Sequence, residues 1–230
     1  MASFLVDGRI LVDTGWCNVL KMLEQGLNPL NIEYLIFTHM HHDHYLGLPQ
    51  LLFYLACRKI LGVYKPPRPL TIIGPSKQLR KIVATSQALL QIRRYPELAI
   101  ALQIVSLKPG ATFKGAGFVL ETMAAKHSSG GKLREEALTC KYTDTALAKS
   151  FVFTGDTSFH PPIAAFAKNT PLLIHDACHT SPGDAAVVAK SARAGKLYLI
   201  HGSNRVRSLK AARKVFKNSF WAEDGKRVEF

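Results

Sequence analysis

A short segment near the N-terminus concentrates side chains that bind metal ions. It reads Thr-His-Met-His-His-Asp-His and contains His39, His41, Asp43 and His44. Neutral imidazoles suit zinc and similar ions, and a carboxylate adds a hard oxygen ligand. Two ions about 4 Å apart can share a hydroxide and hold a phosphoryl or acyl group between them. The segment therefore predicts a dinuclear metal site.

The spacing within this segment divides its side chains between two ions. An apolar, β-prone run precedes the segment, and a run with helical apolar spacing follows it. Because residues two apart at the end of a strand point the same way, His39 and His41 can bind one ion together. Asp43 and His44 lie where the chain turns into the helix and can reach a second ion. His42 is out of phase, and we expect it to face the solvent or to contact a ligand.

Five further segments complete a recognisable pattern. They are Leu11-Val12-Asp13-Thr14-Gly15, Ala125-Lys126-His127, Phe153-Thr154-Gly155-Asp156-Thr157, Leu173-Ile174-His175-Asp176-Ala177-Cys178 and Leu199-Ile200-His201-Gly202-Ser203-Asn204-Arg205. By their order and spacing, these segments and the histidine-rich one resemble the motifs of the metallo-β-lactamase superfamily, and more closely its ribonuclease Z-like branch. The segment around Asp176 is similar to the His-Glu-Ala-Thr stretch of that branch, with Asp in place of Glu.

The resemblance implies two divalent ions as cofactors, zinc first, with manganese and iron as alternatives. The ligands that it implies are, for the first ion, His39, His41 and His127, and for the second, Asp43, His44 and His201, with Asp156 as the bridge. Asp43 also counts among the expected catalytic residues. Asp13 would orient the histidines, since metal-bound imidazoles usually hydrogen-bond a carboxylate through their other nitrogen. A turn aspartate at Asp13 and an ordinary loop histidine at His127 stay open as alternatives.

Asp176 and His179 are the expected proton donors to the leaving group. In the ribonuclease Z-like pattern, an acid in the His-Glu-Ala-Thr stretch pairs with a later histidine, and here His179 follows Asp176 almost directly. A carboxylate hydrogen-bonded to an imidazole holds the ring and favours its protonated form, as a general acid requires. The alternative is a loop histidine ahead of a helix that Thr180 or Ser181 caps.

The bridging residue narrows the reaction. Zinc β-lactamases of this superfamily place a cysteine where this chain has Asp156, and a carboxylate bridge favours a hydroxide shared between two close ions. That arrangement suits in-line attack on a phosphodiester. The resemblance therefore implies a metal-dependent phosphodiesterase or nuclease. Two alternatives stay open: a hydrolase of another ester class (aryl sulfate, thioester or lactone), and a nucleic-acid-binding protein whose metal site is structural.

The charge balance predicts an anionic substrate, which for the phosphodiesterase that the resemblance implies would be RNA or a small phosphodiester. Lys and Arg number 30 against 16 Asp and Glu, which gives a formal net charge of +14. Such a field attracts polyanions, although basic helices are more often solvated faces. The basic residues gather over 58–68, 77–94 and 205–217. Beside His201, Arg205 and Arg207 could hold a phosphate oxygen through their guanidinium groups.

Length and composition predict one α/β domain over residues 1–230, and the resemblance implies the four-layer αββα sandwich. The chain has 230 residues with 47% hydrophobic content, enough for a sizeable core. The expected strands are 4–6, 9–12, 34–37, 70–73, 101–106, 118–124, 138–142, 151–153, 172–175 and 197–200. The expected helices are 19–26, 46–61, 77–93, 185–194 and 209–216.

The chain departs from the ribonuclease Z pattern in two places. The strand that usually opens that domain, with its Gly-rich turn, is not found. Only residues 127–156 separate the third and fourth motifs, which leaves no room for the arm that grips tRNA. This departure weakens the expectation of tRNA processing and leaves the metal chemistry unchanged.

The remaining features concern location and assembly. No apolar run reaches the roughly 18 residues that a membrane span needs, and no signal peptide is recognisable. The cysteines lack C-x-x-C spacing, so we expect a reducing cytoplasm. We expect Cys178 to be a buried small residue and His175 to be a structural member of its motif. A homodimer is left open.

Overall fold

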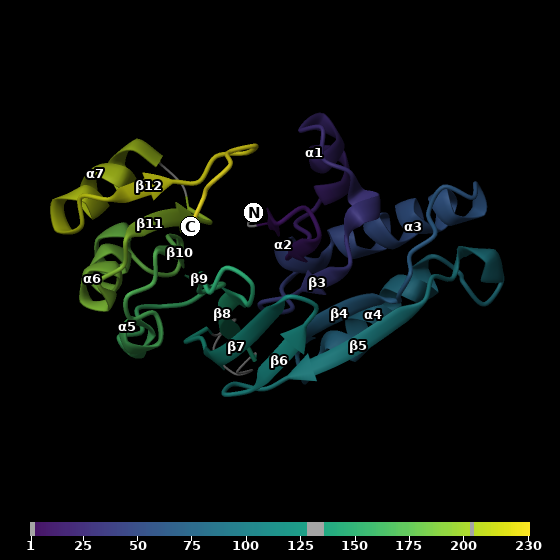
Figure 1. Cartoon of the computed structure of the whole chain (residues 1–230), viewed down its shortest axis with the longest axis horizontal. Coiled ribbons are helices and arrows are strands. Elements are labelled where there is room, and N and C mark those ends of the chain that lie inside the picture. Colours follow the sequence, from purple (N-terminus) through teal and green to yellow (C-terminus); the bar gives the residue numbers. More distant parts are fainter. Residues whose placement is uncertain (1–2, 128–135, 203–204) are drawn as a thin grey trace. The chain divides into compact units, whose positions relative to one another are not determined.

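The computed structural model describes residues 3–127, 136–202 and 205–230 (Figure 1). The chain divides into two compact units, which we call unit 1 (Met1–Ser106) and unit 2 (Leu107–Phe230). Each unit is built on its own mixed β-sheet, and its helices pack against that sheet or against one another. The single domain expected over residues 1–230 stays a prediction.

Unit 1 carries the histidine-rich segment. In chain order its elements are β1 (Phe4–Val6), β2 (Ile10–Val12), α1 (Asn18–Glu24), η1 (Pro29–Asn31), β3 (Tyr34–Ile36), α2 (His42–Tyr45), α3 (Gly47–Ile60), β4 (Leu70–Pro75), α4 (Leu79–Leu89), η2 (Pro96–Leu98) and β5 (Leu102–Leu107), whose last residue begins unit 2. Within the described residues, the strands form a five-stranded sheet in the order β1-β2-β3-β4-β5. β1 and β2 make an antiparallel hairpin, and its turn residues Asp7 and Gly8 both have positive φ, as tight turns of this kind require.

The parallel strands of unit 1 bring the ends of two motifs together. β2, β3 and β4 run parallel, with Val12, Ile36 and Ile73 in register. All three strands are buried along their length, as parallel strands usually are. Parallel strands end at the same edge of a sheet, so the residues that follow β2 and β3 meet there. The backbone N–H of Asp13 accordingly donates to the carbonyl of Ile36 at 2.8 Å.

Helix α3 is fixed by its apolar face and by its first residue. Its buried leucines recur at helical spacing and belong to one core cluster with β2, β3 and β4; they are Leu48, Leu51, Leu52 and Leu55. At its start, a Cβ on Gly47 would lie 2.7 Å from the carbonyl oxygen of Thr14. Glycine therefore permits a close approach between α3 and the loop after β2. This approach also places α2 beside that loop.

Unit 2 carries the later motifs. In chain order its elements are β6 (Thr112–Gly115), β7 (Phe118–Ala124), β8 (Leu138–Asp144), β9 (Ser150–Phe153), α5 (Pro162–Phe166), β10 (Leu172–Asp176), α6 (Pro182–Ala192), β11 (Lys196–Ile200), α7 (Arg205–Val215) and β12 (Ser219–Trp221). Within the described residues, the sheet order is β12-β11-β10-β9-β8-β7-β6. β9 to β12 are parallel, and β6 to β9 form an antiparallel meander.

Small residues set the packing of the helices in unit 2. Helix α6 contacts β10, β11 and α7, and α7 contacts β12 (Figure 1). The buried face of α6 consists of alanines and one valine: Ala185, Ala186, Val188, Ala189 and Ala192. Such short side chains let the helix backbone approach the sheet closely. Ser181 caps the helix, because its Oγ accepts from the N–H of Asp184 at 3.1 Å.

Most of the expected elements are present, with shifted ends. Helix α4 ends at Leu89, short of the expected residue 93, because Gln91 adopts a left-handed backbone with φ 52°. Helix α7 begins at Arg205, one turn before the expected start. β6, α5 and β12 were not expected. The sequence Ser-Ser-Gly-Gly over residues 128–131 also predicts a loop, and this segment lies outside the described residues.

The fold does not test the expected cytoplasmic location or the possible homodimer. No helix in the described part of the chain is long and apolar enough to cross a membrane. No disulfide joins the cysteines, all of which the structure describes. The cytoplasmic location and the homodimer stay predictions.

Candidate metal centre

In unit 1, a buried carboxylate organises the histidine-rich segment. Asp13 follows β2 and is 2% exposed. Its Oδ1 accepts from the N–H of Thr38 at 2.9 Å, and its Oδ2 accepts from the hydroxyl of Thr38 at 2.8 Å. The same Oδ2 lies 2.8 Å from Nδ1 of His44. Asp13 therefore ties the end of β3 to the short helix α2.

These hydrogen bonds decide the tautomers of two histidines. A carboxylate only accepts, so Nδ1 of His44 carries the proton. The hydroxyl hydrogen of Thr38 is used on Asp13, so the contact of 3.1 Å between Thr38 Oγ1 and His39 Nδ1 has the ring nitrogen as donor. In both rings Nε2 is then the nitrogen with the lone pair, which is the form in which histidine binds metals.

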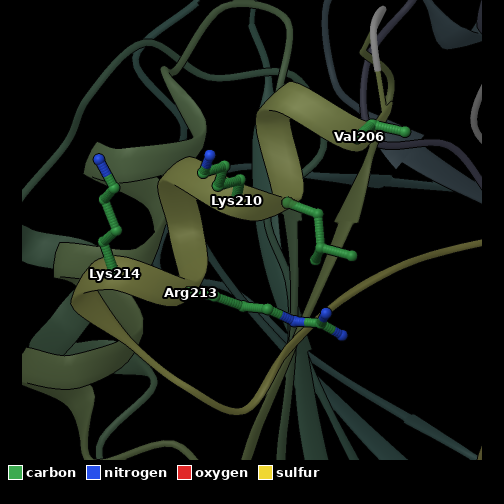
Figure 2. Close-up of a pocket in the computed structure, with 5 residues that line it drawn as sticks. Val206, Lys210, Arg213 and Lys214 are labelled. Atoms are coloured by element: carbon green, nitrogen blue, oxygen red, sulfur yellow. The ribbon is translucent and has the colours of Figure 1, made fainter.

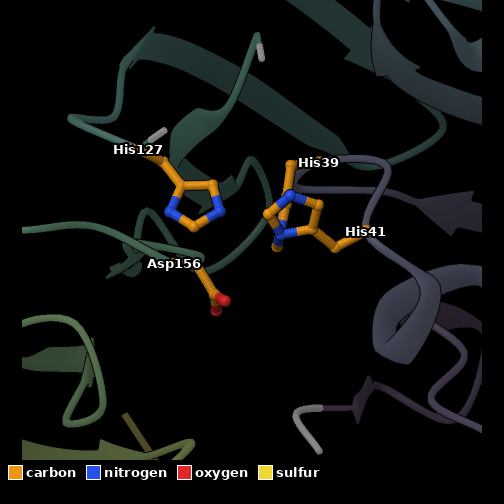
Figure 3. A group of neighbouring side chains, drawn as sticks. All are labelled: His39, His41, His127 and Asp156. Carbon is orange, nitrogen blue, oxygen red and sulfur yellow. The ribbon is translucent and has the colours of Figure 1, made fainter. Parts of the chain in front are cut away.

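The rings of unit 1 are packed closely. The centroid of His39 lies 4.6 Å from that of His41 and 4.0 Å from that of His44. Figure 3 includes His39 and His41. His44 Nε2 is 3.5 Å from Oδ2 of Asp43. Since both atoms present lone pairs in this tautomer, the pair suits a cation. His42 is exposed, with its ring centroid 5.7 Å from that of Tyr45, so it faces the solvent as expected.

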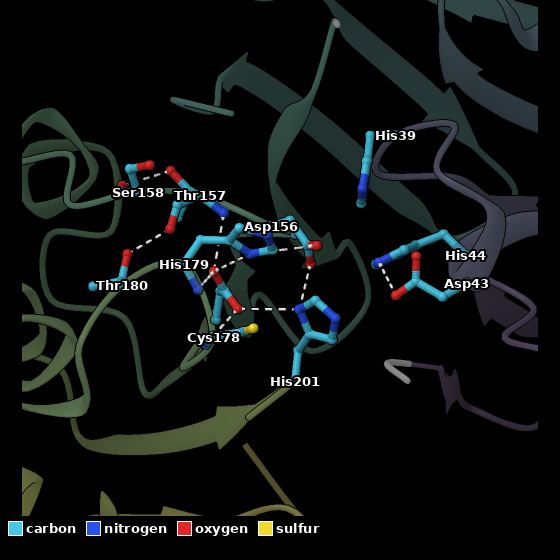
Figure 4. A network of polar contacts seen from close by, with 12 residues as sticks. His39, Asp43, His44, Asp156, Thr157, Ser158, Cys178, His179, Thr180 and His201 are labelled. Atoms are coloured by element: carbon cyan, nitrogen blue, oxygen red, sulfur yellow. Dashed lines mark hydrogen bonds and ion pairs between the residues drawn. The ribbon is translucent and has the colours of Figure 1, made fainter. Parts of the chain in front are cut away.

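In unit 2, parallel strands deliver a second group of ligand-type side chains. Asp156 follows β9, Asp176 ends β10 and His201 follows β11, and these strands are neighbours in the sheet. Together with His179, they place their ligand atoms within 4.8 Å of one another (Figure 4). The ring of His127, drawn with Asp156 in Figure 3, lies 4.8 Å from that of His179.

Asp176 is the centre of a hydrogen-bond network whose other members, Thr157, Cys178, His179 and His201, are labelled in Figure 4. The Asp176 carboxylate is fully buried and accepts from five donors. Three are the backbone N–H groups of Thr157 at 3.2 Å, Cys178 at 2.9 Å and His179 at 3.0 Å. Two are ring nitrogens, His179 Nδ1 at 3.1 Å and His201 Nδ1 at 3.3 Å. A buried carboxylate needs such partners, and this one fixes both rings.

The buried carboxylates of Asp156 and Asp176 lie close together and are stabilised by positive charge. Asp156 is 2% exposed, and its carboxylate lies 3.1 Å from Nδ1 of His201 and 3.5 Å from Nδ1 of His179. Hydrogen bonds to Asp156 and then to Asp176 raise the pKa of His201 to about 10, against the effect of its own burial. Two buried carboxylates beside imidazoles fit a divalent cation, which would take the place of the proton on His201.

Thr38 and Thr157 organise the hydrogen bonds of the site, although no sequence motif assigns them a role. Thr157 Oγ1 accepts from the N–H of Lys126, next to His127, while its carbonyl accepts from the hydroxyl of Thr180. Each threonine directly adjoins an expected ligand, which is the signal that could have identified them.

Other expected residues have mixed outcomes. Cys178 is exposed, so the expectation of a buried residue was wrong. It lies in the turn after β10, where its backbone N–H donates to Asp176 and its side chain is exposed. His175 is fully buried and its Nδ1 donates to the Asp176 carbonyl at 2.8 Å; burial lowers its pKa. Arg207 is exposed on α7, and the side chain of Arg205 lies outside the described part.

A family model described as "Beta-lactamase superfamily domain" matches residues 8–202, most of the chain. The chain belongs to the metallo-β-lactamase superfamily. The fold of this superfamily member, α/β with two mixed sheets, and its ribonuclease Z-like resemblance are as expected from the sequence. Its His/Asp clusters are consistent with a metal site of the superfamily.

Relatives of this superfamily member include proteins named ribonuclease Z. That of Metallosphaera sedula is 27% identical over 259 aligned positions, covering 94% of this chain and 87% of that protein. That of Bacillus subtilis is 26% identical over 275 positions, covering 93% and 86%.

Solved structures show the same fold. The metallo-β-lactamase fold protein YhfI from Bacillus subtilis has a TM-score of 0.75 at 22% identity, covering 97% of this chain and 89% of that one. The short form of human tRNase Z has a TM-score of 0.73 at 21% identity, with the same coverage.

Proposed function

We propose that this protein is a metal-dependent phosphodiesterase that binds two divalent ions, with zinc as the first choice. The observation that carries the proposal is the carboxylate of Asp156, buried beside His201 and Asp176, at the position where zinc β-lactamases of the superfamily have a cysteine. The ribonuclease Z relatives support the same reaction class. A structure of similar fold, TM-score 0.67 at 16% identity, is a diphosphatase of the PhnP family.

We assign the metal ligands by donor type and by family pattern. They are His39, His41, Asp43, His44, His127, Asp156 and His201. The tautomers of His39 and His44, with Nδ1 as the donor, support their part in this set. Asp13 acts through His44 and is a positioning residue. When bound, the two ions would supply an activated water and positive charge next to the phosphoryl oxygens.

We assign the proton donor to His179. Asp176 accepts from both the N–H and Nδ1 of His179, so the ring is held with Nδ1 toward the carboxylate. The other nitrogen, Nε2, can then give its proton to the leaving oxygen when the ring is protonated. At 34% side-chain exposure, His179 is accessible to a substrate, whereas Asp176 is fully buried.

The substrate class that we propose is RNA or a small phosphodiester. The formal net charge of +14 favours an anion, and the exposed Arg207 offers a guanidinium near the end of the motif that contains His201. The short span from His127 to Asp156 leaves tRNA gripping by an arm outside the proposal.

A panel of model substrates tests the proposal. The metal-loaded protein should hydrolyse bis(p-nitrophenyl) phosphate faster than p-nitrophenyl phosphate, because a monoester dianion binds two cations without exposing phosphorus to attack. Faster turnover of an aryl sulfate, a thioester or a lactone would replace the phosphodiesterase with one of those activities. Metal binding without turnover of any substrate, combined with tight RNA binding, would instead indicate a structural metal site.

A further inference from the structure

Helix α7 carries a basic surface groove. The groove is lined by Val206, Leu209, Lys210, Arg213 and Lys214 (Figure 2). Figure 2 shows the side chains of Lys210 and Lys214 extending from the same side of the helix, with Arg213 reaching across to another side. Lys210 and Lys214 are four residues apart, about 6 Å along the helix axis. Two positive charges thus follow one another along a single line.

The surroundings of the groove reinforce its charge. Between Asp184 and Glu223 the chain contains no Asp or Glu and nine Lys or Arg. They are Lys190, Arg193, Lys196, Arg205, Arg207, Lys210, Arg213, Lys214 and Lys217. Helix α6, which packs against α7, contributes the exposed Lys190 near its C-terminal end. Within this stretch no carboxylate side chain offsets the positive field, so the local density of positive charge exceeds that of the chain as a whole.

Arg213 is fixed in place by its own contacts. Its Nε donates to the carbonyl of Ser219 at 3.0 Å, and its guanidinium carbon lies 6.0 Å from the centroid of the Phe220 ring. These contacts leave the terminal nitrogens of the guanidinium to act as donors at the edge of the groove. A pre-oriented arginine loses less entropy on binding a phosphate than a mobile one.

We propose that α7 is a docking surface for the phosphate backbone of an RNA strand, with Lys210 and Lys214 contacting successive phosphates. This inference rests on the proposed function, which it deepens by locating where a polymeric substrate is held. The groove is lined by one helix only and is open, so it suits an extended chain and not an enclosed small ligand. The exposed apolar Val206, 83% accessible, provides a contact for a sugar or base.

The chemistry of the helix favours RNA over an anionic membrane. Helices that lie on membranes bury a broad apolar face with aromatic or leucine side chains. On α7, Ala212 is buried in the core of unit 2 and Leu209 is only partly exposed. Val206 is then the large apolar side chain that α7 exposes fully in the described part of the chain. The groove floor is largely aliphatic, from Val206, Leu209 and the stems of the cationic side chains, but it is narrow and bordered by the charged ends of Lys210, Arg213 and Lys214. A row of cations along one helix, without a broad face of aromatic or leucine side chains, fits a polyphosphate.

The test compares two double variants that remove the same charge. Binding of a fluorescent single-stranded RNA of about 20 nucleotides is measured by anisotropy over a range of salt concentrations. The double variant Lys210→Ala with Lys214→Ala should bind RNA roughly tenfold more weakly near 0.1 M salt. The plot of log K against log salt should become less steep by about 1.4, because two phosphate contacts are lost. The control, Arg80→Ala with Lys81→Ala on the exposed face of α4, should change binding less than about twofold. Unchanged melting temperatures establish folding in both variants.

The outcomes separate this inference from the proposed function. Equal weakening in both variants would mean a general field with no docking surface on α7, and would overturn the inference. Unchanged RNA binding in the α7 variant would also overturn the inference. The same holds if the α7 variant binds RNA normally but no longer binds anionic vesicles. Hydrolysis of bis(p-nitrophenyl) phosphate by the unmodified protein tests the proposed function independently. The unmodified protein could fail to hydrolyse this diester while the α7 variant still loses RNA binding selectively. That combination would support the docking surface on α7 and contradict the proposed phosphodiesterase activity.

Discussion

In each unit, one buried aspartate orients a histidine that we assign as a metal ligand. Asp13 binds His44 and Thr38, and Asp176 binds His179 and His201. In both cases a carboxylate faces Nδ1, which directs Nε2 away from the aspartate. Orientation therefore comes from residues that we do not assign as ligands. Variants at ligands and at these aspartates should have different signatures.

The bridging assignment of Asp156 predicts a loss of metal. The unmodified protein should contain about two transition-metal ions per chain, and Asp156→Ala should contain markedly fewer and show no activity, because the carboxylate is buried beside His201. Elemental analysis after gel filtration measures the content. Glu97→Ala, which removes an exposed carboxylate in η2, serves as the control. Full occupancy in Asp156→Ala would remove this residue from the bridge.

His179→Ala should separate proton transfer from metal binding. It should keep both metals yet slow a diester with an alkoxide leaving group by roughly 10²–10⁴, with a much smaller effect on p-nitrophenolate release, which needs no proton. His160→Ala, at a loop histidine, is the matched control. Asp176→Asn should damage both reactions, because Asp176 also holds His201 and the N–H of Thr157. Equal losses on the two substrates in His179→Ala would instead indicate a positioning role.

The raised pKa of His201 predicts that metal uptake depends on pH. In the metal-free protein its folded pKa of about 10 exceeds the ordinary value of 6.5. The proton therefore stabilises the metal-free fold fully below pH 6.5, and this contribution is lost as the pH rises through 10. Between these values a metal must displace the proton, so its apparent affinity should increase with pH.

Calorimetry measures this proton release directly. Zinc titrations near neutral pH in two buffers with different ionisation enthalpies should show protons released on binding, and His201→Ala should release about one fewer. An identical release from both proteins would show that His201 does not exchange its proton for the metal.

At the scale of elements, strand ends gather the functional groups, and the backbone there is unusual. Asp13 and His201 follow β2 and β11, and both adopt positive φ, 51° and 54° respectively. Such a backbone is costly for residues other than glycine and is frequent at functional sites. After His201, Gly202 allows close packing, since a Cβ there would lie 2.7 Å from Cη2 of Trp221 and 2.9 Å from the carbonyl of Ala177.

Gly202→Ala should therefore disturb the site through the backbone. The added methyl group should cost about 1–3 kcal/mol of folding free energy and lower the melting temperature by several degrees, while activity falls as His201 shifts. Gly183→Ala in α6 is the control, because its nearest neighbour would be Ser181 Oγ at 3.9 Å, and alanine suits a helix. A neutral Gly202→Ala would show that the β11 loop adapts without moving the histidine.

Local patterns account for what the sequence could predict. The parallel strands were visible as short apolar runs, and the histidine spacing is contained within one segment, so neither depends on distant contacts. β12 was missed because Ser219 begins it and leaves no apolar run like those of the three-residue strands β1, β2 and β3. The five residues of α5 are too short to show a helical period. The first turn of α7 was missed because its polar residues carry no apolar signal. The ligands beyond the first segment came from resemblance, since only the fold brings Asp156, Asp176 and His201 together.

For the whole molecule, we expect the metals to be a major source of stability. A ligand that binds only the folded state adds about 4 kcal/mol at a concentration 1,000 times its dissociation constant. Removing metal with a chelator should lower the melting temperature by roughly 5–15 °C, and adding zinc should restore it. Asp156→Ala should respond far less to either treatment. A melting temperature that is indifferent to chelation in the unmodified protein would argue against metal ligands within the folded core.

The acid-free stretch between Asp184 and Glu223 has a second consequence. Trypsin cleaves after lysine and arginine, and α7 alone contains Arg205, Arg207, Lys210, Arg213 and Lys214. A helix must open locally before a protease can cut it. Proteolysis of α7 therefore reports both how often this helix frays and whether a polyanion covers it. A nucleic acid bound to α7 would therefore protect these sites from trypsin, so the extent of cleavage measures how much of the surface is occupied.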